Sequence, residues 1–209
     1  DKLFDEEEPD IVGVTHTDAD GYGCEVMLRE AYPNKNVIIV TAAAGSGPTS
    51  LLEMGDYIAD KVSRSTPVYI MDLSPNTGKG EEFIAPFKNH PVTVIDHHDW
   101  SEEDEKMIRW FADVHLNRDK CATRIVHDTL IDSPKDKITN LAYLTEDHDL
   151  WIKEDRERSD KLSDLANYID KDEYVELARQ HGDEIINSDE GVEYIKKAQA
   201  ERKEKTNLA

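Results

Sequence analysis

The 209-residue chain has only two cysteines, Cys24 and Cys121. They form no CxxC pair and nothing that resembles a disulfide framework, so a disulfide-stabilised secreted scaffold is excluded. A reducing compartment, the cytoplasm, is therefore the expected location. No apolar run approaches the roughly 20 residues that cross a bilayer, and we expect no membrane partner.

Basic residues are also scarce. The 25 Lys and Arg stand against 46 Asp and Glu, which gives a formal net charge of -21. Such a surface repels polyphosphate at long range unless cations intervene, so a long nucleic-acid duplex is not an expected partner. Apolar residues still make up 38% of the chain. That content, in a chain of this length, predicts a globular domain with its own core.

Five short runs rich in Val and Ile indicate buried strands. They lie at residues 11–15, 37–41, 68–71, 92–95 and 112–116. Helical patterns lie between them at residues 25–31, 49–62, 81–87 and 102–111, the last preceded by a capping Ser101. This alternation predicts an α/β fold with a doubly wound, mainly parallel five-stranded sheet flanked by helices.

After about residue 120 the strand signal stops and helical patterns continue to the end. They cover residues 122–131, 137–144, 161–169, 173–180 and 191–203. We expect one domain over residues 1–188, with a sheet core at about 11–120 and a helical cap at about 121–188. Residues 189–209 are highly charged and are expected to form a helix, a possible linker to a second lobe.

His and Asp residues recur where the predicted strands end. The first strand runs into HTDADG at 16–21, the third ends at Asp72, and the fourth runs into DHHD at 96–99. A further acidic cluster occupies residues 146–151, near the end of a predicted helix. Open α/β sheets place their active sites at the carboxyl ends of the strands. Imidazole suits Mn, Fe and Zn, so the pattern predicts a metal site at this edge.

Each cluster alone also has a structural interpretation. An Asx-type turn fits HTDADG, a cap or turn fits Asp72, and a solvated helix end fits residues 146–151. A calcium-binding EF-hand loop is excluded, because the twelfth position counted from His16 is Met27 instead of the required Glu. Gly21 is expected to let the backbone turn sharply, so that the carboxylates around it converge.

Taken together, the clusters resemble the DHH phosphoesterase superfamily. The resemblance rests on HTDADG at 16–21, MD at 71–72, DHH at 96–98 and DHDLW at 147–151, in that order. The HxDxDG form is more similar to RecJ-type nucleases and nanoRNases than to family II pyrophosphatases, where the His and the first Asp lie further apart. The resemblance implies an N-terminal catalytic DHH domain.

The resemblance also implies two divalent metal ions, with Mn²⁺ preferred and Mg²⁺ second. Such a pair activates water and neutralises charge on phosphoryl oxygens. His16 and Asp18 would bind one ion, Asp20 and His97 the other, and Asp72 and Asp147 would be shared or complete the set. His98 would face the substrate and Asp96 would orient a His, so that His98, Asp72 and Asp96 are the implied catalytic residues. The role of Asp149 stays open.

The function implied by the resemblance is hydrolysis of phosphodiester bonds in single-stranded or very short nucleic acid. The acidic charge is consistent with short substrates, because it disfavours long polyanions. Two alternatives stay open: a small-molecule phosphoesterase acting on cyclic dinucleotides or pyrophosphate, and a non-catalytic binding or regulatory module. Nothing after residue 151 matches the Gly-Gly-His motif of the family's substrate-binding lobe. We expect that lobe to be missing from the chain by truncation, and the alternative is a single-lobe variant of the family.

Overall fold

The computed structural model describes residues 8–42, 55, 58 and 61–207. Five strands form one sheet in the order β2-β1-β3-β4-β5, and every neighbouring pair is parallel. The strands are β1 (Ile11–His16), β2 (Val37–Ala42), β3 (Val68–Met71), β4 (Val92–Asp96) and β5 (Asp113–Leu116). The expected α/β fold is confirmed, and the sheet is parallel throughout.

Helices connect and follow these strands. They are α1 (Ala19–Ala31), α3 (Gly80–Ile84), α4 (Glu102–Arg109), α5 (Ala122–Leu130), α6 (Asp136–Asp149), α7 (Arg156–Tyr168), α8 (Lys171–His181) and α9 (Asp189–Asn207), with short 3-10 helices η1 (Ala85–Phe87) and η2 (Gly182–Asn187). Most of the helix expected at 49–62 lies outside the described residues. Within those residues, no helix is both long and apolar enough to cross a membrane.

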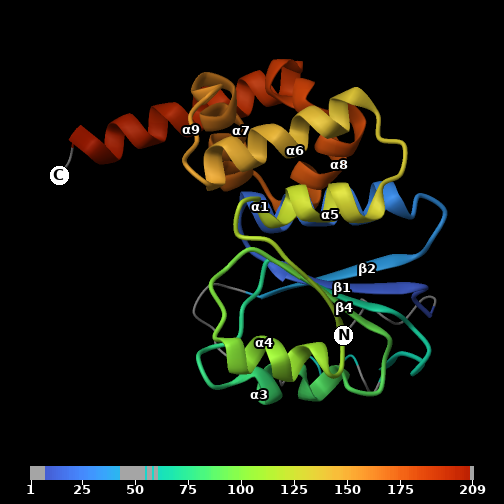
Figure 1. The fold of residues 1–209 in the computed structure, drawn as a ribbon. Coiled ribbons are helices and arrows are strands. Elements are labelled where there is room, and N and C mark those ends of the chain that lie inside the picture. The colour runs from blue at the N-terminus through green and yellow to red at the C-terminus, as the bar shows by residue number, and fades with distance from the viewer. Residues whose placement is uncertain (1–7, 43–54, 56–57, 59–60, 208–209) are drawn as a thin grey trace.

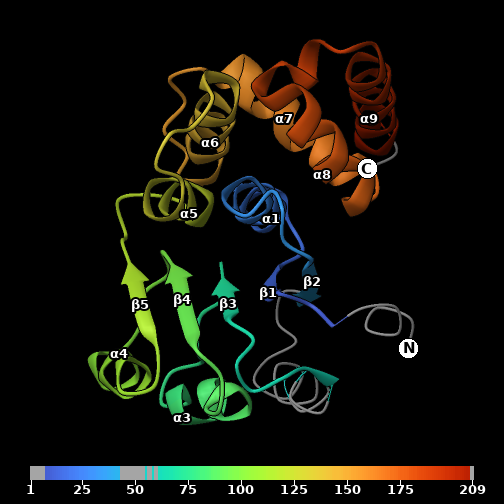
Figure 2. The ribbon, with the colours of Figure 1, turned by 90° about the vertical axis from the view of Figure 1, so that its right-hand side faces the viewer.

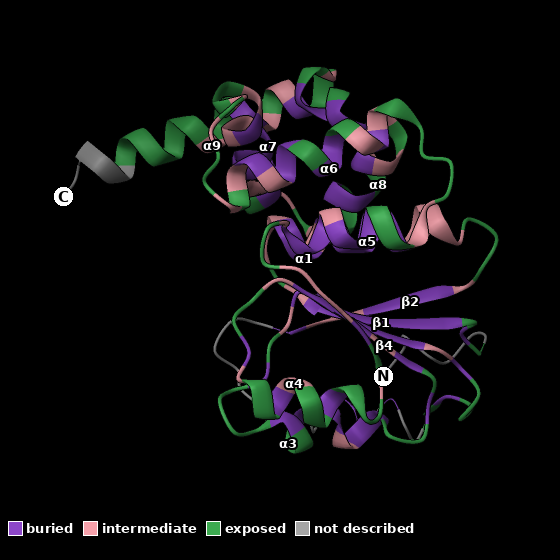
Figure 3. Cartoon of the chain, viewed as in Figure 1, coloured by how far each residue is buried: buried purple, intermediate pink, exposed green. Residues whose placement is uncertain are grey.

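The helices form layers on the two faces of the sheet. Helices α1 and α5 cover one face, and α3 and α4 cover the other (Figure 1). Helices α6, α7 and α8 lie beyond α1 and α5, as the second view also shows (Figure 2). The end of α9 projects from this helical layer, and its described side chains are exposed (Figure 3).

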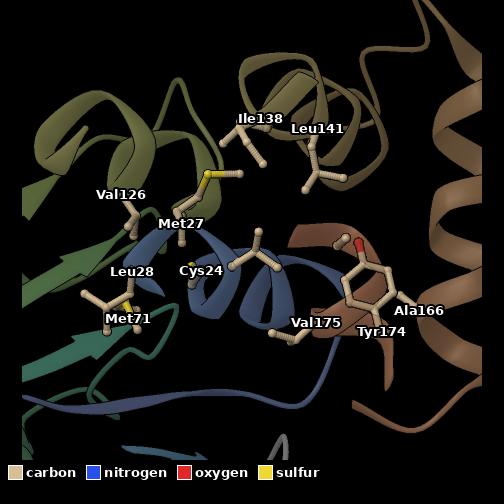
Figure 4. Packing of buried hydrophobic residues seen from close by; sticks show 14 of the residues in the cluster. Cys24, Met27, Leu28, Met71, Val126, Ile138, Leu141, Ala166, Tyr174 and Val175 are labelled. Atoms are coloured by element: carbon tan, nitrogen blue, oxygen red, sulfur yellow. The ribbon is translucent and has the colours of Figure 1, made fainter. Parts of the chain in front are cut away.

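Each face of the sheet has its own apolar core, as expected for parallel strands that are buried on both sides. The core under α3 and α4 includes Val12, Val14, Ile70, Phe83 and Ile108. The core on the other face surrounds α1, whose Met27 and Leu28 pack between the sheet and the helical layer (Figure 4). This second core continues through α6, α7 and α8 to Ile195 of α9, and therefore joins the helical layer to the sheet.

The strand order sets the position of a binding site. After β1 the chain moves to one side of the sheet to form β2, and then returns to the other side of β1 to form β3. The carboxyl ends of β1 and β3 therefore flank the switch point, where open α/β sheets bind their ligands. His16 is the last residue of β1, Asp72 directly follows β3, and Asp96 ends β4.

Helices α1 and α5 approach each other closely at Gly23. A Cβ atom at this position would lie 2.2 Å from Thr123 Oγ1, which donates a hydrogen bond to the Asp20 carbonyl oxygen. Gly23 thus permits a contact that holds the N-terminal turns of both helices together. These are the turns that carry and contact the candidate site residue Asp20.

We expect Gly23→Ala to lower the free energy of unfolding by about 1 to 3 kcal/mol through overpacking, although alanine is the better helix former. Urea unfolding would measure this change. Thr123→Ala, made alone and combined with Gly23→Ala, completes a double-mutant cycle. The double variant should lose less stability than the sum of the single variants, because it removes the clashing atoms. Additive losses, or a stable Gly23→Ala variant, would contradict the close contact.

Candidate metal centre

The end of β1 and the start of α1 supply the first group of candidate ligands. His16 Nδ1 lies 2.5 Å from Asp18 Oδ2, and the other Asp18 oxygen accepts a hydrogen bond from Gly21 N as the N-cap of α1. Gly21 itself lies inside the helix, where a Cβ atom would be 2.2 Å from the His16 carbonyl oxygen. The absence of a side chain at Gly21 therefore lets the first turn of α1 pack against the backbone of His16. The sharp turn expected from the sequence is not the role of this glycine.

Asp72 lies between two histidines. Its Oδ1 is 3.5 Å from His97 Nε2, and its Oδ2 is 3.9 Å from His16 Nδ1. The side chain is only 3% exposed, and Oδ2 has no hydrogen-bond partner in the described part of the chain. The backbone of Asp72 has a φ of 54°, in the left-handed region that few non-glycine residues occupy. A buried, unpartnered carboxylate oxygen held by strained backbone suits a position where a cation binds.

The second group consists of Asp20, His97 and Asp149. His97 Nε2 lies 3.7 Å from Asp20 Oδ2 and 3.7 Å from Asp149 Oδ2. The Asp20 carboxylate also accepts hydrogen bonds from the backbone N–H groups of Ala122 and Thr123, at 2.8 Å each. The N-terminus of α5 thus fixes the orientation of Asp20 and partly balances its charge.

Asp96 and His98 form a hydrogen-bonded pair next to these two groups. Asp96 is 1% exposed and accepts a hydrogen bond from Trp100 Nε1 at 2.6 Å, while its other oxygen lies 2.7 Å from His98 Nδ1. The hydrogen bond to Asp96 raises the pKa of His98, against the effect of burial. The histidine that Asp96 contacts in this way is His98, and the His98 side chain is about half exposed.

The structure does not bring Asp147 to these groups, although the sequence predicts it as a ligand. One Asp147 oxygen accepts from Glu154 N and the other from Ser159 Oγ, at 2.6 Å each. Asp149 lies beside His97 instead. Both residues belong to the last turn of α6, and positions two apart on a helix point about 200° away from each other. Only one of them can face the sheet edge.

Negative charge is concentrated at this point. Burial, and then the carboxylates of Asp20 and Asp18, raise the pKa of Asp72 well above its ordinary range and the pKa of Asp149 to about 7. Cations are the natural compensation for such a cluster. The donor atoms are carboxylate oxygens and imidazole nitrogens, a set that suits Mn²⁺ and related divalent ions.

The residues present therefore fit divalent metal ions. Two groups of donor atoms each lie within 4.8 Å of one another: His16, Asp18 and Asp72, and separately Asp20, His97 and Asp149. Asp72 directs one oxygen toward each group. A third grouping, of Asp72 with Asp96, His97 and His98, shares residues with these two.

Two features of this centre have no clear signal in the sequence. The backbone donors of Ala122 and Thr123 reach Asp20 across about a hundred residues of sequence, and no side-chain pattern marks them. Trp100 lies just beyond the DHH motif, but its contact with Asp96 depends on how the loop folds back. The phase of α6 decides which of Asp147 and Asp149 faces the sheet edge, and the helix predicted at residues 137–144 ends before both, whereas α6 extends to Asp149.

Comparisons with known proteins support the fold. No protein-family model matches the chain. A Helicobacter pylori protein named 3′,5′-cyclic-nucleotide phosphodiesterase is 25% identical over 128 residues, which cover 57% of the chain and 35% of that protein. An uncharacterized protein from Helicobacter pylori G27 matches with a TM-score of 0.68 at 19% identity, over 90% of the chain and 60% of that structure.

The crystal structure of exonuclease RecJ bound to manganese also matches, with a TM-score of 0.57 at 14% identity. The match covers 96% of the chain and 64% of RecJ. At these identities the two structures show a shared fold. The chain spans about a third of the phosphodiesterase and less than two thirds of either structure.

Removing the buried charge should stabilise the protein in the absence of metal. In EDTA, we expect Asp72→Asn to raise the free energy of unfolding by about 0.5 to 2 kcal/mol, because the site is held at a cost to stability. Asp147→Asn is the matched control, since Asp147 is also buried but both of its carboxylate oxygens accept hydrogen bonds. It should lose about 1 to 3 kcal/mol. If urea unfolding shows a lower free energy of unfolding for Asp72→Asn, the buried charge of Asp72 does not destabilise the metal-free protein, and the interpretation is wrong.

The same pair of positions on α6 tests which carboxylate binds metal. Calorimetric titration with Mn²⁺ should show that Asp149→Asn weakens binding at one site by more than about 100-fold, because even indirect partners of a metal contribute about 10- to 100-fold. Asp147→Asn should keep the affinity of the parent. The reverse result would assign the ligand to Asp147, as the sequence alone predicts.

Proposed function

We propose that this chain is the catalytic part of a divalent-metal-dependent phosphoesterase that hydrolyses phosphodiester bonds in single-stranded or very short nucleic acid. The observation that carries the proposal is Asp72, a buried carboxylate with an unpartnered oxygen between two His-containing groups at the switch point of the sheet. Carboxylate and imidazole donors at such a position are typical of two-metal sites that act on phosphate esters.

Two divalent ions, Mn²⁺ before Mg²⁺, would supply Lewis acidity and an activated water when bound. His16 and Asp18 would hold one ion, Asp20, His97 and Asp149 the other, and Asp72 would serve both. The N-terminus of α5 keeps Asp20 in place through two backbone hydrogen bonds. This preorganisation leaves less of the ligand geometry to be assembled when metal and substrate arrive.

His98 is the group that would meet the substrate. Asp96 engages Nδ1, which leaves Nε2 of this half-exposed ring directed away from its anchor. The raised pKa of His98, caused by the hydrogen bond to Asp96, increases the share of imidazolium near neutral pH. Through Nε2, the His98 ring would donate a hydrogen bond to a phosphate oxygen or deliver a proton to the leaving oxygen.

Short substrates are favoured by the acidic surface, because a net charge of -21 repels long polyanions. The fold shared with exonuclease RecJ supports a nucleic-acid substrate. A second candidate is a small cyclic phosphodiester, favoured by the relative named 3′,5′-cyclic-nucleotide phosphodiesterase. Candidate ligands at the end of each motif argue against a non-catalytic module, since such a module has no need for the buried charge of Asp72.

The substrate proposal is tested with purified protein and Mn²⁺ on a panel of phosphate esters. We expect the highest kcat/KM on dinucleotides or short single strands, and lower values on cyclic dinucleotides, pyrophosphate and a long duplex. Asp72→Ala should be inactive on every member. A clear preference for pyrophosphate, or activity without any divalent ion, would overturn the proposal.

The two histidines of the DHH motif should behave differently. His97→Ala should lower metal occupancy, and excess Mn²⁺ should restore part of the activity. His98→Ala should retain the metal but lower kcat by about 10² to 10⁴, the usual contribution of a general acid. Calorimetry and turnover on a dinucleotide would be measured for both variants. Equal metal loss in the two variants would refute this division of roles.

A further inference from the structure

A pocket opens directly beside the candidate metal ligands. It lies between the start of α1 and helices α6 and α7, and its volume is about 190 Å³. Asp18, Asp20 and Asp149 form the wall that it shares with the metal centre. A molecule whose phosphate is bound at that centre would therefore place its neighbouring chemical group at this pocket, which we call the side pocket.

Away from the shared wall, the side pocket has an apolar part and a neutral or weakly basic polar part. Ala19, Leu144 and Leu162 form the apolar part, and the polar part consists of Thr145, His148, Ser159, Ser163 and Asn167. Among the described residues that line it, none is Lys or Arg. A second phosphoryl group would find no fixed positive charge there, so an uncharged ring with polar edges suits the pocket better.

Two polar atoms of the side pocket remain available to a ligand. Asn167 Nδ2 donates to the carbonyl and hydroxyl oxygens of Ser163, and His148 Nδ1 lies 3.2 Å from Asp160 Oδ1. Within the described part of the chain, Asn167 Oδ1 and His148 Nε2 have no hydrogen-bond partner. One amide oxygen and one imidazole nitrogen are the kinds of group that recognise the edges of nucleosides.

Trp151 lies next to the side pocket. Its ring packs against His148 with 6.4 Å between the ring centroids, yet the residue is 70% exposed. Its backbone φ of 58° is uncommon for a bulky side chain. Hydrogen bonds from Ile152 N and Lys153 N to the Asp147 carbonyl oxygen hold this turn. Strained backbone that keeps a large aromatic ring in solvent favours a binding role for that ring.

Lys153 fixes the ring further. Its Nζ lies 3.8 Å from the centre of the Trp151 ring and 3.0 Å from Asp160 Oδ1. The ammonium group therefore covers one part of the indole and is itself anchored, while most of the indole remains open to solvent. Such a ring is a stacking platform, because every nucleobase offers a π-face whatever its sequence.

We infer that the side pocket and Trp151 bind the nucleoside part of a nucleotide substrate, with a base stacked on the Trp151 ring. The inference rests on the proposed phosphoesterase function and deepens it. It makes Trp151 a specificity-determining residue, and it selects phosphodiesters that carry a base over pyrophosphate.

Kinetics on a dinucleotide and on an abasic dinucleotide of the same length test this inference in the intact protein. Trp151→Ala should raise KM for the dinucleotide by about 5- to 150-fold, the range that stacking of one base contributes, with little change in kcat. Trp151→Phe should keep part of the affinity. KM for the abasic compound should stay unchanged in both variants.

Trp110→Ala is the matched control for loss of an exposed indole. Trp110 is 82% exposed and follows α4, on the other face of the sheet (Figure 1). It should behave like the parent on both substrates. An equal rise in KM on base-bearing and abasic substrates, or no rise on either, would overturn the inference.

Binding without turnover separates this inference from the proposed function. A methylphosphonate-linked dinucleotide, which resists hydrolysis, should quench indole fluorescence in the parent and in Trp110→Phe but not in Trp151→Phe. Such quenching in a protein that hydrolyses no phosphodiester would support the inference while refuting the proposed function. Quenching that persists in Trp151→Phe would refute the inference whatever the activity.

Discussion

A buried carboxylate at the switch point of the sheet is the constraint on which the site depends. Asp72 is nearly inaccessible to water, has left-handed backbone and lies near several other carboxylates. Without a cation, burial and like charges both oppose its ionised form. A fold that retains this arrangement gives up stability at one place, and divalent metal ions are the compensation that its oxygen and nitrogen donors would accept.

The N-termini of two helices partly balance the negative charge of the carboxylates around Asp72. Asp18 caps α1, while the first N–H groups of α5 bind Asp20. Each of these carboxylates thus balances part of its charge locally and still presents an oxygen to the candidate centre. Because α1 and α5 touch at Gly23, the two capped helix starts lie directly against each other. The packing of these two helices therefore sets the geometry of the candidate ligands.

The sheet was predictable from the sequence because strands buried on both faces appear as continuous Val- and Ile-rich runs. The start of α1 was not predictable, because glycines at positions 21 and 23 suggest a turn. Both glycines are needed for tertiary contacts instead: Gly21 lies against the backbone of His16, and Gly23 lies against Thr123. The motifs at strand ends converge as predicted at one edge, but the choice between Asp147 and Asp149 depends on helix phase. Trp151 belongs to the DHDLW motif, but the motif gives no sign of its left-handed backbone or of its place beside the side pocket.

In the proposed centre, the two groups of ligands share Asp72. Anomalous diffraction from crystals soaked in Mn²⁺ tests it most directly, because the metal positions are seen without reference to activity. We expect two peaks, one in reach of His16, Asp18 and Asp72, and the other in reach of Asp20, His97 and Asp149, with Asp72 contacting both. A single peak, or peaks away from the carboxyl ends of β1 and β3, would contradict it.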